Sequence, residues 1–259
     1  MVFEQEVAYL TARIEVKALG APSCSIGTGF FYNAELKDGS DRTLTLLISN
    51  RHVFIDPTLN LSIKLNRKDK DNAPLHGNII NFEQADFRSI YFPHPDHSID
   101  LACINASQIS HTDAFYRNLH DDFLKDPDYT HIFPGSEATF VGYPANRYDQ
   151  VNNLPLIRKG WISSMPSIDF NGKGQIVLDA QVFQGSSGSP VFTSVNGNYI
   201  LLGVVSETMI RHAQLQTMPA NMPQIGVEQI LGLGLIIKQR HIKELINHAV
   251  EEFAKQNPI

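Results

Sequence analysis

Residues 174–195 read GQIVLDAQVFQGSSGSPVFTSV, in which a turn rich in glycine and serine separates two apolar segments. Both segments contain β-branched and aromatic residues, which predicts two β-strands joined by the turn. Glycine- and serine-rich stretches between strands are usually plain turns. This turn differs because no ionisable side chain occurs from 180 to 193, and its glycines allow backbone N–H groups to converge on a bound atom. The stretch therefore predicts a β framework that presents a serine.

Short apolar segments of the same kind recur on both sides of this turn, separated by Gly, Pro, Asn and Asp. They occupy residues 27–33, 42–49, 59–65, 99–104, 137–144 and 199–206. Many short strands at such spacing predict an all-β barrel or sandwich. The end of the chain differs, because its apolar residues recur as on one face of an amphipathic helix. These residues are Ile242, Leu245, Ile246, Ala249, Val250 and Phe253.

The composition is that of an ordinary globular protein, with 42% apolar and 19% charged residues among 259. The net charge of −6 argues against a nucleic-acid partner, which needs a basic surface. We expect no membrane segment, since no apolar run approaches about 18 residues, and no signal peptide, since the first residues lack a basic region. The two cysteines fit a reducing compartment, so we expect a cytoplasmic protein.

A serine nucleophile needs a base and an acidic group that orients the base. His52 is a candidate base because it directly follows the apolar segment 42–49. Asp100 is a candidate acid because its carboxylate opens the apolar segment 99–104, where an unpaired charge is costly. Each residue alone is more often incidental, since a histidine can end any strand and an aspartate commonly caps a turn. The two gain weight in combination with the serine turn.

Five segments together resemble the chymotrypsin-like (trypsin-like) serine peptidase family, in particular its intracellular bacterial branch and the HtrA protease domain. They are GTGFF at 27–31, SNRH at 49–52, DLA at 100–102, GSSGSP at 185–190 and GVVSET at 203–208. The family pattern G-x-S-G-[GS]-P is met by the fourth segment. The resemblance therefore implies that Ser187 is the nucleophile of a triad with His52 and Asp100.

The resemblance also implies a fold of two packed six-stranded antiparallel β-barrels (trypsin-like) with a C-terminal α-helix. Residues 1–110 would form the barrel that carries the histidine and the aspartate. Residues 136–259 would form the barrel that carries the serine and the terminal helix. Residues 111–135 would form the crossing between the barrels, within a polar stretch at 106–134 that has little strand pattern.

Further roles around the triad follow from the same resemblance. The amides of Gly185 and Ser187 would form an oxyanion hole, and Ser206 would be a supporting partner of Asp100. A substrate chain would pair with residues 206–208. The expected pocket residues are Gln181, Gln184, Thr208, Gly232 and Gly234. We therefore expect small to medium, uncharged side chains at the substrate's P1 position.

Two positions depart from the better-known members of the family. Ser186 stands where secreted members carry an acid, so no activation by a freed N-terminus is expected. Gln181 stands where the trypsin subgroup carries the acid that binds a basic P1 side chain. No cofactor or metal is implied, and the expected partner is a protein or peptide substrate. Because an active cytosolic peptidase needs control, we also expect narrow specificity or a regulatory protein partner at 106–134.

The serious alternative belongs to another class: a catalytically inactive trypsin-like fold that acts as a protein-binding module. It predicts the loss of at least one triad residue, and all three candidates are present. An α/β-hydrolase is disfavoured, because its G-x-S-x-G pattern is not met and the candidate histidine precedes the serine. Covalent labelling of Ser187 by a fluorophosphonate would distinguish an enzyme from a binding module.

Two smaller alternatives concern metal and thiol chemistry. His94 and His97 could form a metal-binding pair, but Pro95 disfavours the helical geometry that such a pair prefers. We interpret the segment as a polar turn before Asp100. Cys24 and Cys103 are better explained as small buried hydrophobic residues than as reactive thiols.

Overall fold

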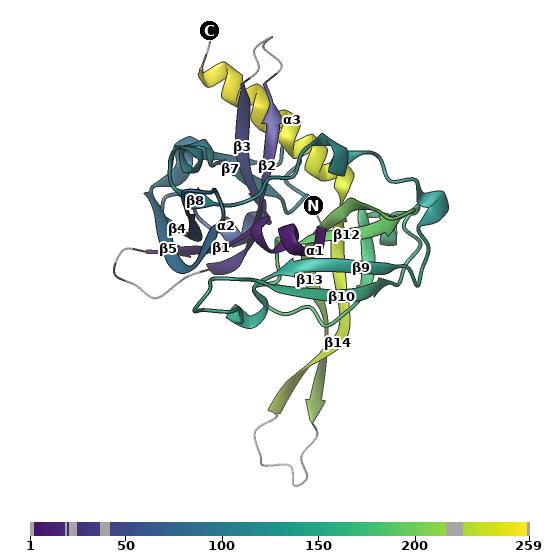
Figure 1. Ribbon diagram of the computed structural model, residues 1–259. Helices are drawn as coiled ribbons and strands as arrows, with labels where there is room; N and C mark the ends of the chain where they lie inside the picture. Colours follow the sequence, from purple (N-terminus) through teal and green to yellow (C-terminus); the bar gives the residue numbers. More distant parts are fainter. Residues whose placement is uncertain (1–2, 19, 21–24, 37–41, 216–224, 258–259) are drawn as a thin grey trace.

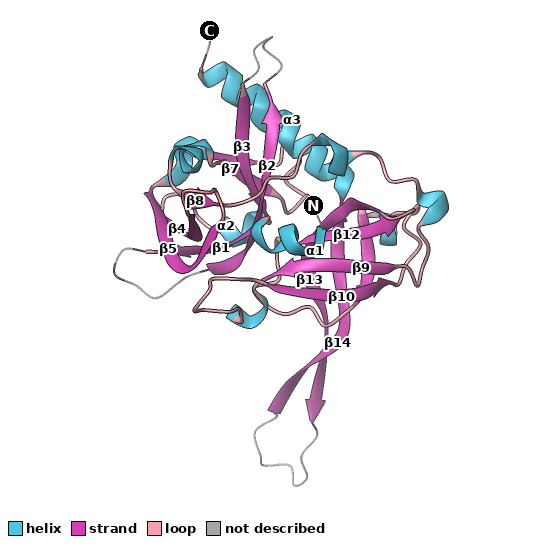
Figure 2. Cartoon of the chain, in the orientation of Figure 1, coloured by secondary structure: helices cyan, strands magenta, loops and turns pink. Residues whose placement is uncertain are grey.

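The computed structural model describes residues 3–18, 20, 25–36, 42–215 and 225–257. Two β units lie side by side, and helix α3 (Gln239–Gln256) contacts strands of both (Figure 1). Apart from α3, the helices are short turns, as Figure 2 shows. They are α1 (Phe3–Glu6), α2 (Arg51–Phe54) and the 3₁₀ turns η1 (Val7–Tyr9), η2 (Phe87–Ile90), η3 (Ser107–His111), η4 (Asp121–Leu124), η5 (Tyr129–His131), η6 (Pro144–Asn146) and η7 (Phe170–Gly172).

The first unit is an antiparallel sheet of eight strands, in the order β5-β4-β1-β2-β3-β7-β6, with β8 paired to β4. The strands are β1 (Thr11–Lys17), β2 (Ser25–Glu35), β3 (Thr43–Ser49), β4 (Asn60–Lys68), β5 (Pro74–Ala85), β6 (Tyr91–Pro93), β7 (Ala102–Asn105) and β8 (Ala114–Phe115). One face of the sheet encloses a core to which Ile14, Phe31, Leu47 and Ile63 contribute. Alternation along β2 puts Phe30 and Tyr32 into a second core, which α3 covers.

The second unit is a closed barrel in the order β10-β11-β14-β13-β12-β9. Its strands are β9 (Glu137–Gly142), β10 (Leu156–Ile162), β11 (Gln175–Asp179), β12 (Pro190–Val195), β13 (Asn198–Leu215) and β14 (Ile225–Lys238). Phe140, Leu178, Val205 and Ile236 meet inside it. Closure removes the exposed strand edges that an open sheet would present. Beyond the barrel, β13 and β14 continue as a paired two-stranded arm (Figure 1).

The all-β class, the six-stranded C-terminal barrel and the terminal helix predicted from the sequence are confirmed. Five of the six residues of the predicted helix face are buried, and the sixth, Phe253, packs against the same core. The N-terminal unit differs from the expected six strands, because the short strands β6 and β8 extend its sheet. Residues 106–134 contain β8 and three 3₁₀ turns.

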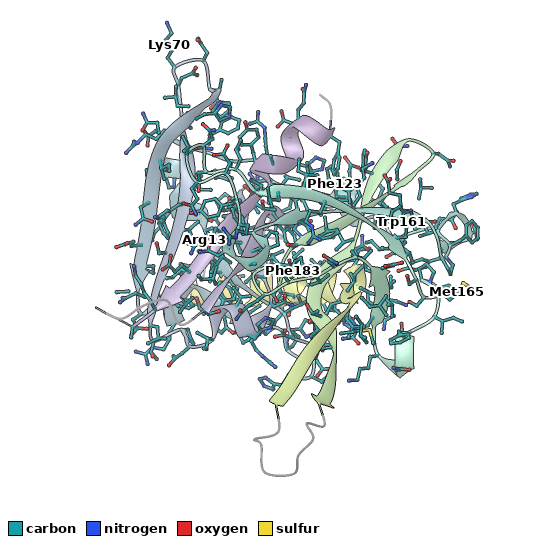
Figure 3. All side chains as sticks on the ribbon, turned by 90° about the horizontal axis from the view of Figure 1, so that it is seen from below. Arg13, Lys70, Phe123, Trp161, Met165 and Phe183 are labelled. Atoms are coloured by element: carbon teal, nitrogen blue, oxygen red, sulfur yellow. The ribbon has the colours of Figure 1, made fainter. Side chains whose placement is uncertain are left out.

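Large apolar side chains also reach the surface of the second unit. Trp161 on β10 and Met165 just after it are about half exposed and lie at the outer side of the molecule in Figure 3.

Candidate active site

The serine loop, residues 183–189, lies directly before β12 in the connection from β11, and it requires glycine at two positions. Gly185 has a φ of +88° and Gly188 a φ of +86°, a region that residues with a Cβ rarely adopt. A Cβ on Gly188 would lie 1.9 Å from the Thr28 carbonyl oxygen, and one on Gly185 would lie 2.5 Å from the Tyr143 carbonyl oxygen. Both glycines therefore let the loop approach neighbouring backbone more closely than any side chain would permit.

Among the three serines of this loop, Ser187 is the most accessible. Ser186 and Ser189 are each 1% exposed, whereas Ser187 is half-buried. The Ser187 carbonyl oxygen accepts the Thr28 amide at 2.9 Å, which fixes its backbone against β2. Its hydroxyl donates to the Ser206 carbonyl oxygen at 3.2 Å. The loop thus presents one serine hydroxyl at the seam.

His52 lies on α2, the helical turn that directly follows β3, and its side chain is 50% exposed. Its Nδ1 lies 2.5 Å from Asp100 Oδ2, and its backbone N–H donates to Asp100 Oδ1 at 3.0 Å. One carboxylate therefore holds both the ring and the main chain of the histidine. With the Nδ1 proton directed at the carboxylate, Nε2 is left as the acceptor nitrogen.

Asp100 is held in place through its own backbone. Its carbonyl oxygen accepts the Arg51 amide at 3.3 Å and the Asn50 side-chain amide at 2.8 Å. Asn50 is fully buried. Sequence reasoning missed it, although an amide side chain just before the candidate histidine was a usable signal.

Thr28 joins the serine loop to the segment that carries His52. In addition to the amide bond to Ser187, its hydroxyl donates to the Gly185 carbonyl oxygen at 2.9 Å and accepts the Tyr143 amide at 3.2 Å. Its carbonyl oxygen accepts the hydroxyl of Ser49 at 2.6 Å. Thr28 is fully buried. A threonine between two glycines in an apolar strand was the only sequence signal for this role.

The structure thus brings His52 and Asp100 into direct contact. It links Ser187 to the end of β3, just before His52, through Thr28, which bonds to both Ser187 and Ser49. Within the described residues, the Ser187 hydroxyl bonds to Ser206 and not to His52. The Ser206 hydroxyl is buried and makes no hydrogen bond there. The contact expected between the Ser206 side chain and Asp100 is therefore not made, and Ser206 acts through its carbonyl oxygen.

The backbone amides of Gly185 and Ser187 have no acceptor among the described residues, unlike their neighbours. The Ser186 amide donates to Phe183 and the Gly188 amide donates to Val205, each at 2.9 Å. Two unpaired N–H groups in one glycine-flanked loop are available to a bound oxygen atom.

Only some of the residues expected to form a substrate pocket lie next to one another. Thr208 and Gly234 are paired across β13 and β14, and the Thr208 hydroxyl donates to the Val182 carbonyl oxygen at 2.8 Å. The buried Val182 side chain packs against Gly234 and was missed from the sequence. Gln181, shortly before the serine loop, and Gln184, within it, are both exposed. Gly232 lies further along β14, with open space around it.

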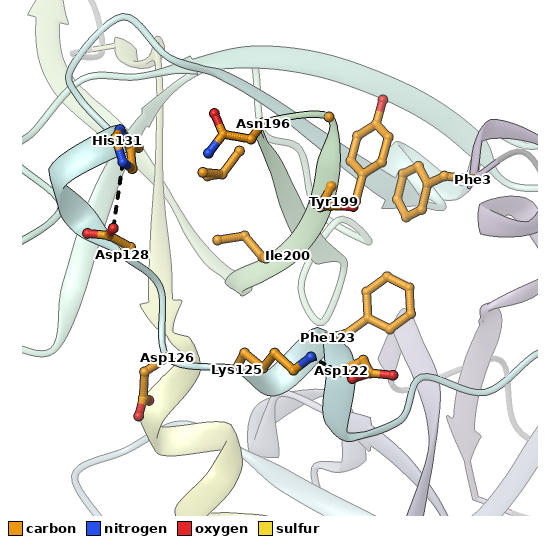
Figure 4. A pocket seen from close by; sticks show the side chains of 13 residues that line it. Phe3, Asp122, Phe123, Lys125, Asp126, Asp128, His131, Asn196, Tyr199 and Ile200 are labelled. Carbon is orange, nitrogen blue, oxygen red and sulfur yellow. Dashed lines mark ion pairs between the residues drawn. The ribbon is translucent and has the colours of Figure 1, made fainter.

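A cavity of about 780 Å³ lies elsewhere, between α1, the crossing segment and the β12–β13 hairpin. Figure 4 shows Phe3, Phe123 and Tyr199 along one side of it and acidic residues along another. None of the candidate triad residues lines this cavity. It is therefore not part of the candidate active site.

The remaining candidates from the sequence separate in the structure. Cys103 is a fully buried free cysteine, and burial raises the pKa of its thiol far above the usual range, as expected for an inert residue. Cys24 lies outside the described residues. His97 is exposed, whereas His94 is buried and contacts α3. The two histidines therefore do not form a pair.

Residues 27–204, more than half of the chain, match the model of the family described as "Trypsin-like peptidase domain". No curated protein matches the chain. Among the described residues, no helix is long and apolar enough to cross a membrane.

Proposed function

The chain belongs to the family of trypsin-like peptidase domains, and on that premise we propose that it is a serine endopeptidase with the triad His52, Asp100 and Ser187. The observation that carries the proposal is the double contact between His52 and Asp100. This double contact fixes the orientation of the His52 imidazole. The fold supports the same conclusion, because the two β units contribute different members of the set.

The proposed reaction follows the acyl-enzyme route. His52 Nε2 accepts the proton of the Ser187 hydroxyl as its oxygen attacks the peptide carbonyl carbon, and Asp100 stabilises the imidazolium. His52 then gives the proton to the leaving amine, and an activated water hydrolyses the acyl-enzyme. The Ser187 hydroxyl must first turn from the Ser206 carbonyl towards His52. Such hydrogen bonds are often misaligned in free enzymes and form when substrate binds.

In this proposal the amides of Gly185 and Ser187 bind the oxyanion of the tetrahedral intermediate. Their lack of acceptors among the described residues supports the role. Because these donors are fixed in a loop that glycine geometry dictates, they need no rearrangement as charge develops. Loss of one such donor costs roughly 3–4 kcal/mol of transition-state stabilisation.

The substrate would add as an antiparallel strand along residues 206–208. Strand β12 begins at Pro190, whose partner on β13 is Val204. Beyond Val205, this edge of β13 has no strand partner among the described residues, so its backbone groups can pair with an extended peptide. Thr208 and Val182 narrow the adjacent space, which supports small to medium, uncharged P1 residues.

The proposal is tested by a fluorophosphonate probe, which reacts with an activated serine. We expect labelling of the folded wild type and none of Ser187→Ala or His52→Ala. The matched control is Ser189→Ala, because Ser189 lies in the same loop and its buried hydroxyl makes no hydrogen bond. It should be labelled like the wild type.

Two results would count against this function in different ways. Label that persists in Ser187→Ala would show that another residue reacts. A folded wild type that takes no label would favour the alternative, a catalytically inactive fold that acts as a protein-binding module.

Substrate preference is tested by sequencing new N-termini in a cell extract treated with wild type or Ser187→Ala. We expect cleavage after small to medium, uncharged residues, and broader cleavage by Thr208→Gly. Cleavage mainly after Lys or Arg would contradict the proposed pocket. The cytoplasmic location, the intracellular bacterial branch and a regulatory partner at 106–134 stay predictions. Full activity on generic peptides without any added partner would argue against the last.

A further inference from the structure

A second group of chemically reactive side chains lies away from the candidate triad, where α3 meets the first unit. His94 follows β6, and His241 and Glu244 stand in the first turns of α3. One donor atom from each of the three lies within 4.8 Å of the others. Of the described residues, these alone form such a group of three. Two imidazoles and one carboxylate are the donor set of many zinc sites.

His94 is the anchor of this group. Its side chain is 1% exposed, and its Nε2 contacts Glu244 Oε2 at 3.3 Å without a well-formed hydrogen bond. A metal ion bound between these two atoms would satisfy the buried nitrogen better than this contact does. The other ring nitrogen, Nδ1, lies 3.1 Å from the Asp96 amide nitrogen and 3.2 Å from the Asp96 carbonyl oxygen. In the tautomer that carries its proton on Nδ1, the ring donates to this carbonyl and Nε2 is free to bind a metal.

Helix α3 supplies the other two groups from one face. His241 and Glu244 are three residues apart, and His241 Nδ1 lies 2.8 Å from Glu244 Oε2. The opposite nitrogen of His241 is buried against Gly174, where a Cβ would lie 2.1 Å from Nε2. The ring therefore presents Nδ1 towards the carboxylate. Glu244 is 51% exposed, which leaves the group open to an ion from solvent.

The charges around the group are compatible with a cation. Arg240 directly precedes His241 on α3, and its guanidinium is held by two hydrogen bonds to Asp169. The Asp96 carboxylate is exposed beside His94 and adds negative charge.

We propose that His94, His241 and Glu244 bind one divalent transition-metal ion, with Zn²⁺ the expected metal and water as a further ligand. Zn²⁺ suits mixed imidazole and carboxylate donors at a site that stays open to solvent. The ion would tie α3 to the connection between β6 and β7. That connection also carries Asp100, and the His94 amide closes it by a 3.0 Å hydrogen bond to the Leu101 carbonyl oxygen.

The test is calorimetric titration of the full-length chain with ZnCl₂ after chelator treatment, in the His52→Ala background so that the candidate triad does not bind zinc. We expect one ion per chain, and a Tm increase of roughly 5–10 °C at a hundredfold excess over Kd. His94→Ala and Glu244→Gln should each weaken binding at least about tenfold. The matched control His97→Ala, in the same connection but exposed, should bind like its parent.

Co²⁺ provides a second readout that is independent of activity. The parent should show visible absorption bands of coordinated Co²⁺, and both variants should lose them. Circular dichroism establishes that each variant is folded, and Glu244→Gln decides the matter if the buried His94→Ala does not fold. Absence of saturable binding to the folded parent, or unchanged binding by folded Glu244→Gln, would overturn the proposal.

Discussion

The backbone amide of Thr28 donates to the carbonyl oxygen of Ser187 at 2.9 Å, so a strand of the first unit directly holds the candidate nucleophile of the second. The Thr28 hydroxyl adds two more bonds across the same seam, to Gly185 and Tyr143. The position of the serine relative to His52 therefore depends on one residue that belongs to neither the serine loop nor α2.

We expect Thr28→Val to reduce both stability and activity. Valine has a similar shape but leaves the Tyr143 amide and the Gly185 carbonyl without their buried partner, at a cost of about 1–3 kcal/mol in unfolding free energy. A displaced loop should lower kcat/KM by up to about a hundredfold. Urea denaturation and peptide hydrolysis measure the two effects.

The matched control for this substitution is Thr193→Val on β12. Thr193 is also buried, and its hydroxyl donates to the Glu137 carbonyl oxygen at 2.9 Å, with no hydrogen bond to the serine loop among the described residues. It should lose stability but keep kcat/KM. An equal loss of activity in both variants would mean that Thr28 acts only through general stability.

Gly188→Ala should be far more harmful than an alanine at another left-handed glycine. Gly197, in the β12–β13 turn, has a φ of +80° and open space around its Cα. Gly197→Ala therefore tests the backbone cost alone, about 1–2 kcal/mol or a Tm decrease of about 2–8 °C. At Gly188 the added Cβ also collides with the Thr28 carbonyl. Thermal unfolding of both variants compares them, and equal Tm decreases would contradict the claim of close approach.

The sequence was sufficient for the elements whose apolar pattern is regular. Phe140 on β9 and Leu178 on β11 lie in predicted strands, and both are buried in the barrel. Strand β1 was not predicted, because Arg13 and Glu15 interrupt its pattern. In the structure these two form a 2.8 Å ion pair with each other, and Arg13 also bonds to Asn146. Such partners are distant in sequence or depend on the fold, so no local pattern reveals them.

The candidate site shows the same division. The glycine pattern around Ser187 and the isolated carboxylate of Asp100 were visible locally. The roles of Thr28 and Asn50 were not, because both act by bonding to backbone groups that only folding brings near. His94 follows β6, whereas His241 and Glu244 lie on α3, so no local spacing in the sequence links the three residues. Sequence spacing suggested His97 as the partner of His94 instead.

Ser206→Ala should have little effect, which separates a backbone role from a side-chain role. The Ser206 hydroxyl is buried without a hydrogen bond, so its removal relieves an unsatisfied group and leaves stability unchanged or slightly higher. The carbonyl oxygen that accepts the Ser187 hydroxyl remains. Measurement of kcat/KM over a pH range checks this. A large loss, or a shifted pH profile, would mean that the hydroxyl supports Asp100 during catalysis.

An acid-sensitive ion pair ties α3 to the barrel. Asp169 accepts from Arg240 and from Lys238, whose side chain is only 3% exposed. These bonds, with Arg240 the larger contributor, hold the pKa of Asp169 well below its usual range. A carboxyl with a depressed folded-state pKa stabilises the fold fully above its unfolded pKa, about 3.9. That stabilisation is lost as pH falls from there towards the folded-state pKa.

We therefore expect Asp169→Asn to lower the unfolding free energy at pH 7 by about 1–2 kcal/mol, a moderate figure because water screens the partly exposed carboxylate. The difference from wild type should shrink below about pH 4, where the Asp169 carboxylate of the unfolded wild-type chain begins to protonate while that of the folded chain stays ionised. Urea denaturation at pH 7 and pH 3 measures both values. The matched control is Asp126→Asn. Asp126 also pairs with a residue of α3, Lys243, but its side chain is 89% exposed. The unfolding free energy of this control should change little at either pH. A loss of unfolding free energy in Asp169→Asn that is equal at both pH values would show that lost packing, not lost charge, destabilises that variant.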